Sequence, residues 1–190
     1  MSAEPAVLQN SLGPSLRRWR MLNRVKQDVL AHELGVSQAR VSRWESGQAT
    51  PAGQHLLEIT RMLRARPETA ADRALVDLVA GSGAPVHLVC DLTHRLLAIS
   101  PARTREWRAP VSEFLNLPLW RFASEGIRSA EASLAERGWY EPDSPDILFQ
   151  TERADFPEMT IPESRIRISR LPLADGSFAR LVREEPLPAA

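Results

Sequence analysis

The stretch from Gln27 to Pro51 constrains this chain more than any other, because its apolar side chains repeat with the period of two short helices. Gly35 separates them, since a glycine can take a positive φ and end a helix at almost no steric cost. Ser37 then stands where the N-cap of the second helix belongs. The apolar positions of the first and second helices are, in order, Val29, Leu30, Ala31 and Leu34, then Val41 and Trp44.

The second of these helices, over residues 37–46, keeps a polar outward face. That face carries Gln38, Arg40, Ser42 and Arg43. Amide and guanidinium groups on one rigid helix can form paired hydrogen bonds with base edges in the major groove of DNA. The stretch therefore predicts a surface that reads double-stranded DNA.

These residues resemble the Cro/CI-type (XRE-family) helix-turn-helix domain. The resemblance is carried by Gln27, Leu30, Ala31, Leu34, Gly35, Val36, Ser37, Val41, Ser42, Arg43, Trp44, Glu45, Gly47 and Pro51. It extends from Leu16 to about Leu63, roughly a quarter of the chain. It implies an all-α, five-helix domain in a bacterial or phage transcriptional regulator that binds palindromic DNA as a homodimer.

The resemblance also implies a role for single residues of this surface. The side chains expected to face base edges are Gln38, Ala39, Arg40 and Arg43, with Arg40 touching either bases or backbone. The expected contacts with the DNA backbone, or residues that position the helix on it, are Gln27, Arg24, Lys26, Ser42, Gln48 and Thr50. Arg24 and Lys26 can equally be read as solvated loop charges, and Arg24 stands where the family often has glycine. Arg20 and Glu45 are expected to form a structural ion pair.

Charge divides the chain in two. Residues 11–66 carry ten basic and four acidic side chains, whereas the remainder carries 14 basic and 20 acidic ones. A basic segment on an acidic remainder indicates a nucleic-acid surface on one part. Cys90 is the sole cysteine, which excludes an intrachain disulfide and disfavours a thiolate metal site. A cytoplasmic protein with no membrane contact is expected, because no apolar run approaches ~20 residues and no signal peptide opens the chain.

Breaker residues predict two domains. The clearest breaker cluster is Gly81-Ser-Gly83-Ala-Pro85, so residues 81–85 are predicted to form a linker. The predicted units are a disordered tail at residues 1–10, a helix-turn-helix domain at 11–80 and a second domain at 86–185. Besides the two helices described above, the first domain is expected to contain helices at residues 11–23, after Pro51, and at 67–80. The last of these could serve as a core helix, a connector or a dimer contact.

The second domain changes to the alternating pattern of β-strands. Strands are predicted at residues 86–90, 95–100, 147–150, 165–171 and 177–183, and a longer helix at residues 124–137. Asp175-Gly176 between the last two strands is typical of a hairpin turn. This order resembles the α+β PAS-type sensory fold, in which a five-stranded antiparallel sheet and its helices enclose a small pocket. The resemblance covers residues 84–184, and no motif in it specifies a ligand.

Aromatic residues of the second domain could line a pocket for an unknown small ligand, or could form its core. They are Trp107, Trp120, Trp139 and Phe149. His87 and His94 are interpreted as surface or hydrogen-bonding histidines and Cys90 as a small core residue. The sequence contains no catalytic triad spacing, phosphate loop or metal cluster, so no catalytic residue, metal or cofactor is identified and an enzyme is not expected.

The prediction is therefore a sequence-specific DNA-binding transcriptional regulator. Its PAS-like domain would sense a signal, mediate homodimerisation, or do both. In the alternative hypothesis, the PAS-like domain is a ligand-free protein-interaction module that recruits RNA polymerase or another regulator. The sequence specifies neither the operator nor the sign of regulation.

Overall fold

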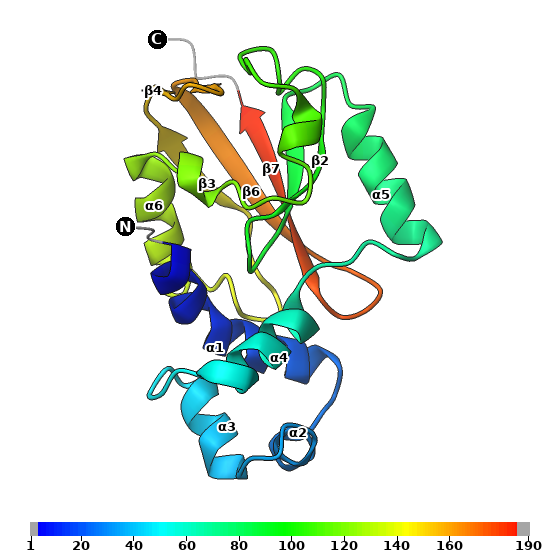
Figure 1. Ribbon diagram of the computed structural model, residues 1–190, viewed down its shortest axis with the longest axis vertical. Coiled ribbons are helices and arrows are strands. Elements are labelled where there is room, and N and C mark those ends of the chain that lie inside the picture. The colour runs from blue at the N-terminus through cyan, green and yellow to red at the C-terminus, as the bar shows by residue number, and fades with distance from the viewer. Residues whose placement is uncertain (1–3, 186–190) are drawn as a thin grey trace.

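The computed structural model describes residues 4–185 and combines a group of helices with a five-stranded sheet (Figure 1). The helices before the sheet are α1 (Glu4–Leu22), α2 (Gln27–Glu33), α3 (Gln38–Glu45), α4 (Gly53–Leu63) and α5 (Ala70–Ala80). The strands are β1 (Val86–Cys90), β2 (Leu96–Ile99), β3 (Ile147–Thr151), β4 (Ala154–Asp155), β5 (Thr160–Ile161), β6 (Ser164–Pro172) and β7 (Phe178–Glu185). Between β2 and β3 lie the short 3-10 helices η1 (Val111–Glu113) and η2 (Trp120–Phe122) and the helix α6 (Glu125–Ser133).

The main sheet has the order β2-β1-β7-β6-β3, and every neighbouring pair is antiparallel. The predicted fold class, an all-α domain followed by an α+β domain with a five-stranded antiparallel sheet, is confirmed. The turn between β6 and β7 contains Gly176 at φ +79°, a conformation that favours glycine. The small hairpin of β4 and β5 was not predicted, because two residues per strand are too few to show alternation.

Helix α1 begins at Glu4 and not at residue 11, so the part of the predicted disordered tail from residue 4 to residue 10 is helical. Pro5 is compatible with this start, because an N–H group in the first turn has no partner within the helix. Pro14 consequently lies inside α1, where it removes one backbone hydrogen bond. The tail at residues 1–3 lies outside the described residues.

Helix α5 begins at Ala70, three residues after the predicted start, because Thr69 caps it. The Thr69 hydroxyl accepts the backbone N–H of Asp72, and the Asp72 carboxylate accepts the backbone N–H of Thr69. The helix packs beside β1 and β2, and its Val79 joins the cluster that contains Val86 (Figure 1). A helix predicted inside the first domain therefore covers the sheet of the second.

Helix α6 is shorter than predicted. It ends at Ser133, and the chain continues through turns to Gly138, which has φ +74°. The four residues between them carry helical periodicity in the sequence but turn in the structure. α6 packs beside β3, at the end of the strand order opposite to α5 (Figure 1).

One hydrophobic cluster crosses from the helices into the sheet. It joins Leu16 and Trp44 of the helical part to Leu88 and Cys90 of β1. Cys90 is fully buried, and its Sγ accepts the backbone N–H of Ala65 at 3.3 Å. The two parts are therefore packed against each other. No helix within residues 4–185 combines the length and the apolar composition needed to cross a membrane.

Candidate nucleic-acid interface and cavity

Helix α3 lies at the end of the molecule remote from the sheet, next to α2 (Figure 1). Its inner face is fixed by Val41 and Trp44, which are 0% and 2% exposed. The four residues predicted to face base edges, Gln38, Ala39, Arg40 and Arg43, are all exposed, and Ser42 is half-buried. Nothing in the described part of the chain covers this polar face.

The turn between α2 and α3 depends on glycine. Gly35 has φ +63°, and the next residue, Val36, donates its N–H to the carbonyl of Ala31 at 2.9 Å. Ser37 is the N-cap of α3, as predicted, and has the extended backbone of that position, but its hydroxyl makes no capping hydrogen bond. Val29 is also not part of the buried stripe of α2, because 46% of its surface is exposed.

Arg20 of α1 and Glu45 of α3 form a two-point ion pair under this surface. The Arg20 Nε and Nη2 atoms donate to the two Glu45 carboxylate oxygens at 2.7 and 2.9 Å. The hydrogen bond with Glu45 raises the pKa of Arg20 above its ordinary value, although burial opposes the shift. The Glu45 side chain is 3% exposed, so the pair is part of the scaffold and not of the outer surface.

Gln27 connects this ion pair to the outer surface. Its Nε2 donates to the Glu45 carboxylate at 2.7 Å, and its Oε1 accepts from Nε2 of Gln38 at 2.7 Å. The Gln27 side chain, which was predicted to contact the DNA backbone, therefore makes two hydrogen bonds within the protein. Gln38 is held in one orientation, with its Oε1 atom and its second N–H still available for a base edge.

The other predicted backbone contacts frame the exposed face of α3. Arg24 and Lys26 lie exposed in the loop before α2, and Gln48 and Thr50 lie exposed after α3. Arg24 has φ +53°, a left-handed conformation that explains why glycine suits this position.

The second domain contains a cavity of about 340 Å³ that is partly open to solvent. One wall is the face of the sheet formed by β1, β3, β6 and β7, and the other is formed by loops and by the start of α6. Its lining side chains are mostly apolar and include Val89, Trp107, Leu119, Trp120, Phe122, Ile127, Phe149, Met159, Ile161, Ile166, Ile168 and Val182. Such a volume lies at the lower end of the range of small-molecule sites.

Three of the four aromatic residues considered for a pocket lie at this cavity, namely Trp107, Trp120 and Phe149. Trp139 does not. It is fully buried in a separate cluster, and its indole N–H donates to Asp91 at 3.0 Å. Sequence spacing could not separate the four, because it does not show on which face of a layer each ring lies.

His87 and His94 also line the cavity. Of the two interpretations of these histidines, surface or hydrogen-bonding, the surface one is therefore wrong for both. Burial, with Arg103 nearby, holds the pKa of His87 well below its ordinary value, so this imidazole is neutral. The Nε2 atom of His94 lies 3.4 Å from the Glu131 carboxylate. Within residues 4–185 no group of three His, Cys, Asp or Glu side chains could hold a metal ion.

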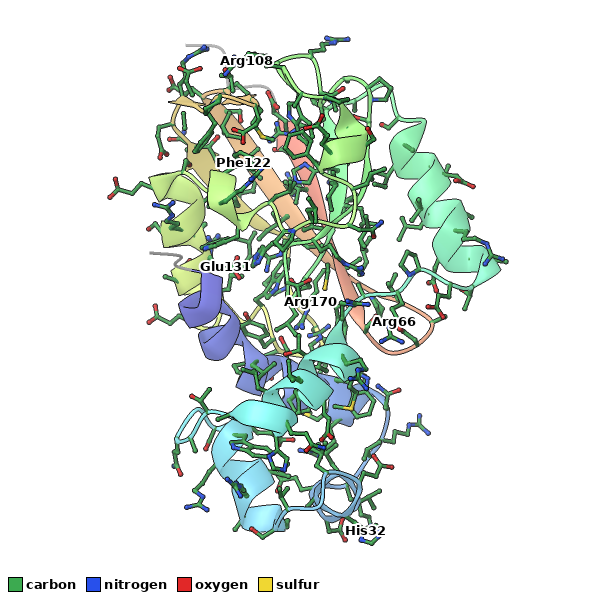
Figure 2. The ribbon with its side chains drawn as sticks, in the orientation of Figure 1. His32, Arg66, Arg108, Phe122, Glu131 and Arg170 are labelled. Atoms are coloured by element: carbon green, nitrogen blue, oxygen red, sulfur yellow. The ribbon has the colours of Figure 1, made fainter. Side chains whose placement is uncertain are left out.

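A buried charge cluster lies beside the cavity, on the side nearer the helical part (Figure 2). Asp91 pairs with Arg170 at 2.7 Å and with Arg180 at 2.8 Å, and Arg180 also pairs with Glu131 at 2.6 Å. Burial would raise the pKa of Asp91, but the two arginines outweigh it and hold the pKa below its ordinary value. The cluster contains two cations and two anions, so its charges balance.

Phe178 links this cluster to the helical part. The Arg170 guanidinium lies 4.1 Å from the Phe178 ring centroid, and the guanidinium of Arg18 in α1 lies 5.0 Å from it. Arg18 is 5% exposed and donates to the carbonyl of Pro142 at 3.1 Å. Burial, with Arg170 nearby, lowers the pKa of Arg18 to about 10.

Comparison with known families matches residues 16–69 to the helix-turn-helix family model. Residues 16–69 form a helix-turn-helix domain. The match includes α2, the Gly35 turn and α3, and it ends before α5 begins.

Two further comparisons concern the whole chain. No curated protein matches it. It is similar to the solved structure of an RNA-binding light-oxygen-voltage receptor, with 10% sequence identity and a TM-score of 0.42. That similarity covers 97% of this chain and 60% of the receptor chain.

The buried cluster of Asp91, Glu131, Arg170 and Arg180 is the part of the structure that sequence reasoning missed. A signal was present, because a hairpin centred on Asp175 places Arg170 directly opposite Arg180. Two like charges on facing strands need a shared counter-charge. The counter-charges, Asp91 and Glu131, lie far away in the sequence and could not be assigned from it.

Proposed function

We propose that this protein is a sequence-specific, DNA-binding transcriptional regulator whose PAS-like domain senses a small molecule. The observation that supports it most is the exposed face of α3, where Gln38, Ala39, Arg40 and Arg43 lie together on a helix anchored by Trp44. A helix of this kind enters the major groove, with its polar side chains against the base edges.

The proposed contacts divide into two kinds. Gln38 would pair with adenine and Arg43 with guanine, each through two hydrogen bonds, while Ala39 offers a methyl contact to thymine. Arg24, Lys26, Gln48 and Thr50 would bind phosphates and hold the register without reading sequence. The hydrogen bonds from Glu45 through Gln27 to Gln38 support this division, because they orient the reading side chain before DNA arrives.

The cavity supports sensing over the alternative of a ligand-free module that recruits RNA polymerase or another regulator. A module that only bound another protein would not need an apolar space of about 340 Å³ within its sheet domain. Homodimerisation is part of the proposal, and palindromic half-sites would lie about 34–36 Å, one helical turn of DNA, apart.

Selection from a random double-stranded DNA library tests this function. The full-length protein should enrich a palindromic motif, and the Gln38→Ala/Arg43→Ala double variant should not enrich it. The Arg128→Ala variant is a matched control, because it also removes an exposed arginine but lies on α6, away from the proposed interface. Failure of the unaltered protein to enrich any motif would reject the function.

A further inference from the structure

Part of the cavity wall is apolar and aromatic. Phe122 and Phe149 line it together with Ile166, Ile168 and Val182 of the sheet. Phe122 is 4% exposed and is held edge-to-face by Phe114 and Phe156, with ring centroids 5.8 and 5.2 Å away. The Phe122 ring is therefore fixed by its neighbours and presents a preformed surface to a ligand.

The buried charges of the wall are already satisfied within the protein. Arg180 lines the cavity and pairs with Asp91 and Glu131 at 2.8 and 2.6 Å. Arg103 pairs with Glu184. Neither guanidinium is free to neutralise a bound anion, and none of the three paired carboxylates is free to neutralise a bound cation.

The wall also carries uncharged polar groups, which cannot neutralise an ion. Among the described residues the His87 Nδ1 and Trp120 Nε1 atoms have no hydrogen-bond partner, whereas two lining hydroxyls have one. The Thr160 hydroxyl donates to Asp155 at 2.6 Å, and the Thr151 hydroxyl lies 3.1 Å from that of Ser164. His87 is neutral, as its lowered pKa indicates, and offers no cation to an anion. Arg105 and Glu106, the remaining charged lining residues, are exposed and bear opposite charges.

An ion that entered this space would lose its hydration without gaining a counter-charge. An uncharged aromatic ring would instead replace water against apolar walls and could make edge-to-face contacts with the fixed Phe122 ring. We propose that the cavity binds a small, uncharged aromatic molecule and excludes its charged analogues. This inference rests on the proposed sensing function and names the chemical class of the signal.

Calorimetric titration of the full-length protein with three compounds of one ring system tests the inference. Indole is uncharged, indole-3-acetate is an anion and tryptamine is a cation at neutral pH. Indole should bind with a Kd below about 1 mM, and each charged analogue should bind at least ~10-fold more weakly because it must be desolvated. Equal or tighter binding of either ion, or no binding of indole, would overturn the proposal.

Two variants show whether binding occurs in this cavity. Ile127→Trp and Val182→Phe each enlarge a half-buried lining residue, and either one should abolish the binding of indole. Leu78→Trp, on the exposed surface of α5, should leave it unchanged. A folded variant of either lining residue that binds indole as the unaltered protein does would place the site elsewhere and reject the inference.

Binding to DNA is measured on the same preparations, because it separates this inference from the proposed function. Retained DNA binding with no indole binding in the unaltered protein would reject the ligand class alone. Indole binding without any DNA binding would reject the regulator function and leave the ligand class standing.

Discussion

Arg24 has a left-handed backbone at a position where Cro/CI-type proteins often carry glycine, with φ +53°. This conformation costs a non-glycine residue roughly 1–2 kcal/mol. Glycine at this position would remove that cost, but its greater freedom in the unfolded chain offsets part of the gain. Arg24→Gly should therefore raise the free energy of unfolding by about 0.5–1 kcal/mol in urea titrations.

The Arg24→Ala variant is the control for charge, since it removes the same guanidinium but keeps the strain. Both variants should weaken DNA binding equally if Arg24 contacts a phosphate, and both should lower the slope of log K against log salt by about one. A gain in stability for Arg24→Ala equal to that for Arg24→Gly would contradict the backbone explanation.

Asp91 is the carboxylate that the two buried arginines share, so its replacement should be costly. Asp91→Asn should lower the free energy of unfolding at pH 7 by ~3–5 kcal/mol, because a buried charge loses its partner. The folded-state pKa of Asp91 is lowered, so its contribution is complete above the unfolded-state value of about 4 and is lost as the pH falls below it.

The penalty of Asp91→Asn should therefore shrink in acid. Urea unfolding at pH 7 and pH 3 measures it, and Asp77→Asn on the exposed face of α5 is the control. A penalty that does not change with pH would show that the carboxylate charge is not what matters.

The role of a single residue could be predicted where it depends on neighbours that are close in the sequence. The roles of Gly35, Val41 and Trp44 could be predicted, because each depends on neighbours within one helical turn or one tight turn. The hydrogen bonding of Gln27 could not be predicted in this way, because its partner Glu45 lies 18 positions away in the sequence. The buried positions of Arg170 and Arg180 depended on hairpin register and on partners far away in sequence.

At the scale of elements, α1 and α3 approach each other through a glycine. A Cβ atom added at Gly13 would lie 2.2 Å from the carbonyl oxygen of Trp44, closer than real contacts permit. Gly13→Ala should destabilise the protein by about 1–3 kcal/mol through overpacking, although alanine ordinarily favours a helix by about 1 kcal/mol.

Thermal unfolding and DNA binding measure this effect, because displacement of α3 should weaken both. Gly83→Ala is the control, since nothing lies within 4 Å of the added atom. A stabilised Gly13→Ala variant would mean that α1 and α3 do not approach as described.

The ends of helices and strands could be predicted where the residue that ends the element lies at the boundary itself. Gly35 and the Asp175-Gly176 turn marked ends that the structure confirms. The packing of α5 was not predictable, because helical periodicity shows which face is apolar but not which partner covers it. The linker predicted at residues 81–85 stays a prediction, and the cap at Thr69 gives a second candidate boundary between α4 and α5.

At the scale of the whole molecule, one hydrophobic cluster runs from α1 and α3 into β1 and β7. The junction also includes Arg18 stacked on Phe178 and the backbone N–H of Ala174 donating to Asp72 at 3.2 Å. The charge asymmetry of the sequence suggested two separate parts, but it carries no information on their packing.

The protein should therefore unfold in one cooperative transition in scanning calorimetry, and Asp91→Asn should shift that whole transition downward. Helix loss, followed by circular dichroism, and exposure of the buried tryptophans, which include Trp44 in the helical part and Trp139 in the sheet domain, followed by fluorescence, should coincide. Two resolved transitions would show that the helix-turn-helix domain and the sheet domain unfold independently.

The central claim is that α3 reads DNA sequence while the flanking loops bind the backbone, and binding of paired variants to the selected site tests it most directly. Arg43→Ala should lose ~1–3 kcal/mol of preference at one base pair. Lys26→Ala should instead weaken all sequences alike and lower the salt slope by about one. An Arg43→Ala protein whose affinity and base preference both equal those of the unaltered protein would contradict the account.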